Sequence, residues 1–153
     1  MTVSTSSAVA AVLVLVAASG RHLSGQRAAA MTDSARLQGT WTMISGGAAG
    51  MTMPASMAAG MKRVAVGNEV TITMNDQLYF KATFALNPAA SPRTIDYQMT
   101  GGPTAGSRQL GIYELQGDTV RFSFAAPNAP RPRTFASVAG DGLTVSTWVR
   151  VSP

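Results

Sequence analysis

Methionine is the residue type whose spacing most directly suggests chemistry in this chain. Met53, Met57 and Met61 are four residues apart, so on a helix their side chains would share one face, and Met51 lies close by. Thioether sulfur is a soft ligand that suits Cu(I). The alternative is an adaptable apolar face that packs against a core, because methionine is unbranched and fills irregular spaces. Segment 51–61 therefore predicts either Cu(I) binding or hydrophobic packing.

The seven Asp and Glu side chains offer little for acid–base catalysis. Thr32 or Asp33 is expected to cap a short helical turn through Leu37. Three further Asp residues are expected in turns, where Asp stabilises the backbone locally: Asp76, Asp118 and Asp141. The remaining carboxylates are Glu69, Asp96 and Glu114. A pair of facing carboxylates could hydrolyse a glycoside, but nothing in the spacing of these three residues places two of them together. Asp96 is instead expected to pair with Arg108. Since no nucleophile–base pair can be named, no catalytic residue and no enzymatic activity are predicted.

The composition narrows the possible functions further. Cysteine is absent, which excludes disulfides, zinc–thiolate sites and cysteine nucleophiles. The one histidine, His22, lies in the N-terminal segment, so the domain that follows lacks the commonest general base and metal ligand. No metal or cofactor is expected. The net charge is +5, but the basic residues are scattered, so nucleic acid is not an expected partner.

The N-terminal segment has the pattern of a secretory signal. Residues 9–18 read VAAVLVLVAA, an apolar run shorter than the roughly 20 residues that a transmembrane helix needs. Small residues offer cleavage after Ser19 or after Ala30. We expect residues 1–30 to be a signal peptide and spacer, and the protein to be extracytoplasmic, periplasmic or secreted, with no stable membrane span after cleavage. The alternative is an anchor that is retained.

From Gly39 onward the pattern has a period of two, which predicts β-strands. Turn dipeptides such as Gly67-Asn68 and Gly117-Asp118 separate the apolar runs. Strands are expected over residues 39–45, 62–66, 69–74, 77–86, 93–100, 108–116, 119–125, 134–138 and 143–151. A short helix is expected over 54–61, because proline suits a first helical position. Residues 31–153 are thus predicted to form an all-β domain, a small antiparallel up-and-down barrel of about eight strands with one short helix.

Aromatic residues recur on the strand faces that should point inward. In strand 77–86, alternation places Leu78 and Phe80 on one face and Tyr79 on the other. The interior of an eight-stranded barrel holds its own side chains or one small ligand. The aromatic side chains therefore line an apolar pocket or fill the core. The candidate lining residues are Phe80, Phe84, Tyr97, Tyr113, Phe122 and Phe124.

Four segments carry a resemblance to a known family. They are residues 37–41 (LQGTW), 92–96 (PRTID), 110–119 (LGIYELQGDT) and 131–135 (RPRTF). From Leu37 to the C-terminus the chain resembles an uncharacterised bacterial domain family of planctomycete type with a lipocalin-like fold. The resemblance implies that fold and no known activity. Gly39-Thr40-Trp41 is also similar to the G-x-W motif of lipocalins, which implies that Gly39, Trp41 and Arg150 close one barrel end, the guanidinium stacking on the indole.

These observations predict a non-catalytic, exported barrel that binds a small apolar molecule inside. One alternative is a structural or protein-interaction module of the cell envelope, with a filled core and an exposed apolar patch near residues 51–61. Its partner would be an envelope protein. The third hypothesis is Cu(I) binding through segment 51–61.

Overall fold

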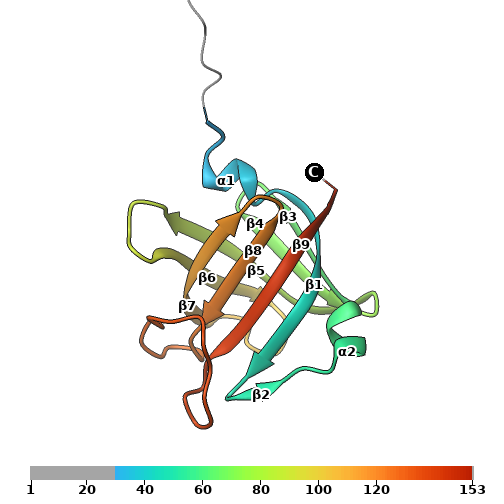
Figure 1. Cartoon of the computed structure of the whole chain (residues 1–153), viewed down its shortest axis with the longest axis vertical. Coiled ribbons are helices and arrows are strands. Elements are labelled where there is room, and N and C mark those ends of the chain that lie inside the picture. Colours follow the sequence, from blue (N-terminus) through green and yellow to red (C-terminus); the bar gives the residue numbers. More distant parts are fainter. Residues whose placement is uncertain (1–29, 153) are drawn as a thin grey trace, which may run out of the picture. The chain divides into compact units, whose positions relative to one another are not determined.

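The computed structural model describes residues 30–152, and within them the chain forms one antiparallel sheet closed into a barrel. Strand order is β2-β1-β3-β4-β5-β6-β7-β8-β9, and β1 also pairs with β9 (Figure 1). The strands are β1 (Gly39–Ala48), β2 (Met51–Thr52), β3 (Met61–Val66), β4 (Glu69–Met74), β5 (Gln77–Asn87), β6 (Arg93–Gly101), β7 (Arg108–Gln116), β8 (Thr119–Phe124) and β9 (Thr144–Ser152). The predicted all-β, up-and-down barrel is confirmed, with eight strands in the closed wall.

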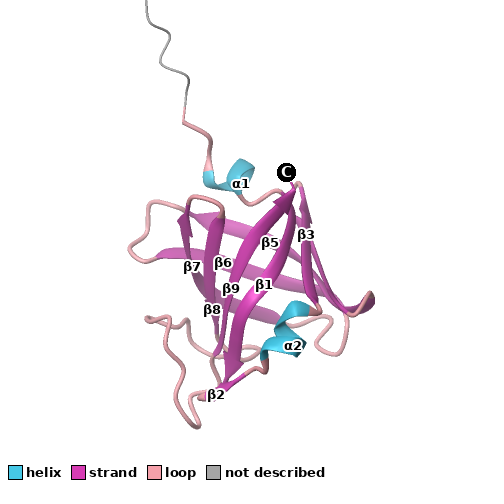
Figure 2. Cartoon of the chain, turned by 45° about the vertical axis from the view of Figure 1, so that its right-hand side comes forward, coloured by secondary structure: helices cyan, strands magenta, loops and turns pink. Residues whose placement is uncertain are grey.

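Two short helices lie at opposite ends of this barrel. Helix α1 (Asp33–Arg36) precedes β1, and the Thr32 hydroxyl caps it by accepting from the Ala35 N–H. Helix α2 (Ala55–Ala59) follows β2 and lies beside β1 (Figure 2). We call the end with α1 the capped end and the end with β2 the open end. Helix α2 is shorter than the predicted 54–61, because Met61 already begins β3.

Tight hairpins set the register of the neighbouring strands. Gly67 has φ of 61° and Gly117 has φ of 58°, and each is the first central residue of a two-residue turn, where the hairpin turn of type II′ requires a positive value. Asn75 and Asp76, with φ of 49° and 64°, are both in the positive region that a two-residue turn of type I′ requires, and they join β4 to β5. Asparagine and aspartate tolerate this region better than other residues with side chains. Three of the predicted turns are thereby confirmed.

A β-bulge in β5 overturns one predicted side-chain orientation. Thr73 pairs with Leu78 and Ile72 pairs with Phe80, so Tyr79 is the extra residue. A bulge interrupts the alternation of faces. As a result Leu78, predicted to point inward, is 53% exposed.

The long connection between β8 and β9 contains no strand, so the strand predicted over 134–138 is wrong. Its last turn is instead organised by Asp141, whose carboxylate accepts hydrogen bonds from the N–H groups of Val138 and Leu143 and from the Ser137 hydroxyl. The two backbone hydrogen bonds come first among the causes that hold the pKa of Asp141 below its ordinary value. Local turn chemistry thus replaces sheet pairing in this segment.

Trp41 and Arg150 close the capped end. The Arg150 guanidinium lies 4.2 Å from the centre of the Trp41 ring, the contact expected from the G-x-W resemblance. It also donates to the backbone oxygens of Gln38 and Arg36, and Trp41 Nε1 donates to the Leu37 oxygen at 3.2 Å. These carbonyl groups belong to the last residue of α1 and the two residues after it, where backbone oxygens otherwise lack partners. Arginine and tryptophan therefore fasten α1 across the barrel end.

The signal peptide and spacer predicted for residues 1–30 lie outside the described residues except for Ala30. Among residues 30–152, neither helix has the length and hydrophobicity needed to cross a membrane.

Arg150→Met should lower the free energy of unfolding by about 2 kcal/mol, because it removes charged hydrogen bonds and the stacking on Trp41. Urea unfolding monitored by tryptophan fluorescence measures the change. Arg133→Met is the matched control, since Arg133 is exposed between β8 and β9. Equal losses in the two variants would contradict the assigned role of Arg150.

Candidate functional site

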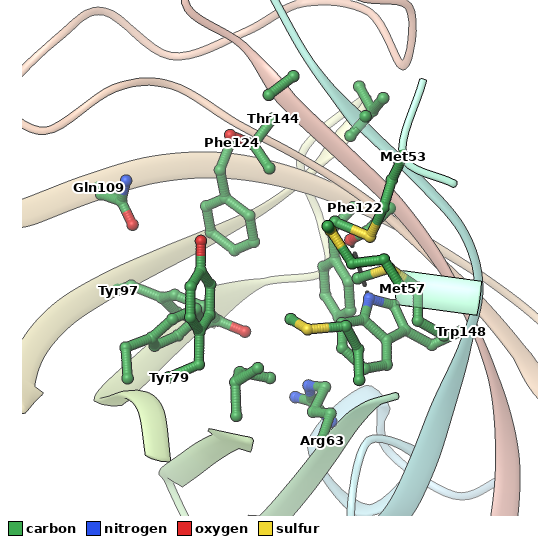
Figure 3. Close-up of a pocket in the computed structure, with 18 of the residues that line it drawn as sticks. Met53, Met57, Arg63, Tyr79, Tyr97, Gln109, Phe122, Phe124, Thr144 and Trp148 are labelled. Carbon is green, nitrogen blue, oxygen red and sulfur yellow. Dashed lines mark hydrogen bonds between the residues drawn. The ribbon is translucent and has the colours of Figure 1, made fainter. Parts of the chain in front are cut away.

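The interior of the barrel contains a cavity of about 630 Å³ that reaches from the middle of the barrel to its open end. Its lining comes from α2 and from all nine strands, β1 to β9. Figure 3 shows the space enclosed between Tyr79 and Tyr97 and the opposing Phe122, Met57 and Trp148. The volume lies within the range typical of small-molecule pockets, roughly 300–1,000 Å³.

Four of the six predicted lining residues border this cavity: Phe80, Tyr97, Phe122 and Phe124. Their rings contact one another in sequence. The ring centres of Tyr97 and Phe124 are 4.3 Å apart, those of Phe80 and Tyr97 6.1 Å, and those of Phe122 and Phe124 5.8 Å. This arrangement fixes the rings and forms a continuous aromatic wall.

The other two predicted lining residues lie elsewhere. The Phe84 side chain is buried, but its ring centre lies 6.0 Å from the Arg63 guanidinium and does not border the cavity. Tyr113 belongs to the capped end, where its hydroxyl donates to the Asp33 carboxylate at 2.6 Å. Alternation placed both residues inside correctly, but it carries no information about depth along the barrel axis.

Methionines form much of the opposite wall. Met51, Met53, Met57 and Met61 all border the cavity, as do Met43 and Met99. Only Met57 lies on α2, whereas Met51 is in β2 and Met61 begins β3. The methionines therefore reach the cavity from different elements and do not share one helical face. A Cβ atom added at Gly46 would lie 2.8 Å from Met43 Sδ and 3.6 Å from Met53 Sδ. Glycine at this position of β1 leaves space for both thioethers.

The lining also includes residues that were not predicted, among them Tyr79, Trp148 and Arg63. Tyr79 turns to the cavity because it is the bulged residue of β5, which no alternation pattern reveals. Trp148 is buried, and its indole N–H donates to the Ser146 hydroxyl at 2.8 Å. Arg63 lies between the buried residues Met61 and Ala65 on β3, so alternation in that strand was a signal for an inward arginine.

Arg63 is the one charged side chain in the described lining, and it is 0% exposed. Its Nη1 donates to the Leu37 oxygen at 3.0 Å, so it reaches the underside of the capped end. The guanidinium carbon lies 5.3 Å from the centre of the Phe122 ring. Within residues 30–152, its Nε and Nη2 have no hydrogen-bond partner. The cavity is therefore apolar along its wall, and a buried cation lies behind its inner end.

The carboxylates lie on the outside of the barrel. The predicted Asp96–Arg108 pair is present at 2.7 Å, and Arg131 joins it at 2.6 Å. Burial favours a raised pKa for Asp96, but hydrogen bonds and charge from Arg131 and Arg108 outweigh it and lower the pKa. Glu114 pairs with Arg121, and Glu69 is exposed. In the described part of the chain, no cluster of three or more His, Cys, Asp or Glu residues could hold a metal ion.

Comparisons with family models, curated proteins and solved structures give no match to this chain. The resemblance to the planctomycete-type family stays a prediction.

Stability at alkaline pH should report the contact between Tyr113 and Asp33. Burial, followed by the hydrogen bond and the negative charge of Asp33, raises the pKa of Tyr113 above its ordinary value of 10.0. The folded state then holds this proton more tightly than the unfolded state, so stability is present below pH 10 and is lost as the pH rises beyond it. We expect Tyr113→Phe to reduce this alkaline loss.

Urea unfolding across a pH series measures the effect, with Tyr79→Phe as the control because Tyr79 is partly exposed at the open end. The same pH dependence in wild type and Tyr113→Phe would show that the contact does not stabilise the fold.

Proposed function

We propose that this protein is a non-catalytic, exported barrel that binds a small apolar molecule in its cavity. The observation that carries the proposal is the cavity of about 630 Å³ walled by aromatic and thioether side chains. The apolar run over residues 9–18, with small residues after it, supports export.

The physical reason for ligand binding is the cost of an empty apolar space. Side chains that face a void lack partner atoms and lose dispersion contacts. Water molecules in this cavity would form few hydrogen bonds, because most of the wall is apolar. An apolar molecule would restore the contacts and leave water at the same time, which favours its binding.

The open end supplies a route for such a molecule. Met51 is 76% exposed and Met57 is 46% exposed, and both border the cavity. Unbranched thioether side chains reorient at low cost and adapt to ligands of different shape. A methionine-rich rim therefore suits a binding site that admits apolar guests.

One of these observations also agrees with the alternative, a structural or protein-interaction module of the cell envelope with a filled core. Its expected apolar patch agrees with the exposure of Met51 and Met57. A filled core, however, would leave no space for a ligand, and the cavity favours the binding function.

A bulky side chain at the open end should weaken ligand binding. Thr144 is an exposed residue that begins β9 and borders the cavity. Thr144→Trp should raise the Kd for the neutral dye Nile red about tenfold by obstructing the mouth. Fluorescence titration measures the Kd.

Val66→Trp is the matched control, because Val66 is also exposed and β-branched but ends β3 at the capped end. Wild-type protein that binds no Nile red, and that native mass spectrometry shows to be empty when it is purified from its own host, would refute the proposed function.

The same methionines support a second candidate function, Cu(I) binding. Met53, Met57 and Met61 border one cavity together with Met43, and thioethers are soft ligands. This candidate predicts stoichiometric binding of Ag(I), a stable substitute for Cu(I), which is lost in the triple variant Met53→Leu, Met57→Leu, Met61→Leu. Isothermal titration calorimetry is the measurement.

Met31→Leu, an exposed residue outside the cavity lining, is the control for the silver titration. Absence of stoichiometric Ag(I) binding to the wild type would eliminate this candidate and leave the methionines as an apolar wall.

A further inference from the structure

We propose that the ligand is an amphiphile with one carboxylate, such as a fatty acid, and that its carboxylate binds Arg63 at the inner end of the cavity. This inference rests on the proposed ligand-binding function and specifies the chemical class of the ligand. It comes from a buried cation whose donors and charge are left unmatched by the part of the chain that the structure describes.

The first step is the hydrogen bonding of Arg63. A guanidinium carries five N–H donors and is always charged. One nitrogen, Nη1, donates to Leu37, whereas Nε and Nη2 are buried without a partner within the described residues. Burying donors without partners is unfavourable, and more so when the group is charged. The barrel therefore maintains an unfavourable group at the place where a ligand would arrive.

The second step is the absence of a counter-charge. The chain has seven Asp and Glu side chains. All seven belong to the described part of the chain, and none of them borders the cavity. The two aromatic rings near Arg63, those of Phe84 and Phe122, attract the cation through their faces but accept no strong hydrogen bond. A negative charge at this position would have to come from a bound molecule.

The third step is the shape of the vacant donors. Nε and Nη2 lie on the same edge of the planar guanidinium and present two parallel N–H groups. This edge matches the two oxygens of a carboxylate, which arginine commonly binds in bidentate fashion. The paired donors thus favour a planar, singly charged head over a hydroxyl, which is neutral and offers one oxygen to the two parallel N–H groups.

The fourth step is the direction of the cavity. Arg63 reaches toward Leu37 at the capped end, while Met51 and Thr144 border the cavity at the open end. Figure 3 shows Arg63 at one end of the space, with Met53, Phe124 and Thr144 toward the other. An amphiphile would lie with its head inside and its apolar tail along the aromatic and thioether walls.

Arg63 is fully shielded in the empty barrel, so the head must displace a side chain to reach it. The next inward residue on β3 toward the open end is Met61, which also borders the cavity. Its unbranched thioether chain reorients without strain to the backbone. Reorientation of Met61 would therefore open a path from the cavity to the cation.

The test compares two molecules that differ only in the head, decanoate and decanol, by displacement of Nile red below their aggregation concentrations. Wild type should bind decanoate roughly 10- to 100-fold more tightly than decanol, the range expected for charged hydrogen bonds. Arg63→Met should lose this preference and keep its affinity for decanol. Arg121→Met, which removes an exposed arginine on β8, should behave as wild type.

A second measurement uses wild type alone and does not depend on the folding of Arg63→Met. The carboxyl carbon of labelled decanoate should keep its ionised NMR chemical shift when bound, at pH values where free decanoate takes up a proton. Contact with a cation lowers the pKa of a carboxyl group. A bound carboxyl that titrates like the free acid would overturn the assignment.

The remaining outcomes separate this inference from the proposed function. Equal affinity of wild type for decanoate and decanol would overturn the carboxylate and leave apolar binding in place. A preference for decanoate that persists in Arg63→Met would overturn the role of Arg63. Failure of wild type to bind decanoate, decanol or Nile red would overturn both proposals.

Discussion

The pairing of β1 with β9 is the constraint on which the rest of the structure depends. It joins the first and last strands of the barrel, from Thr40 and Ser152 at the capped end to Ala48 and Thr144 at the open end. Closure removes the exposed edges of the sheet and fixes the diameter of the interior. Because eight strands enclose limited space, the size of the inward side chains then decides how much of it remains for a ligand.

The two ends of the barrel are built from different chemistry. At the capped end, Arg150 and Arg63 both donate to backbone oxygens at the C-terminal end of α1 and just after it. Arg150 also has a carboxylate partner in Asp118, at 3.1 Å. Arg63 has none within residues 30–152, so closing this end places an uncompensated cation inside an apolar barrel. The hydrogen bond from Arg63 to the Leu37 oxygen thus helps to close the barrel end and also places a guanidinium next to the cavity.

The wall of the cavity combines rigid and adaptable surfaces. Tyr97, Phe122 and Phe124 hold one another through ring contacts. Met53 and Met57 face them from segments that contribute little to the sheet. A fixed aromatic wall opposite a thioether wall can accept a flexible chain without a defined shape, which suits a tail better than a rigid ring system.

The sequence by itself determined the barrel, its hairpins and the inward direction of most aromatic residues, because alternation and turn dipeptides are local properties of the chain. It did not determine which inward residues meet in a cavity. Phe84 and Phe80 share a face of β5, yet only Phe80 borders the space. Depth along the barrel axis depends on register between strands, and the bulge at Tyr79 depends on pairing with β4. The vacant donors of Arg63 depend on which groups surround them, and only the closed tertiary structure brings those groups together.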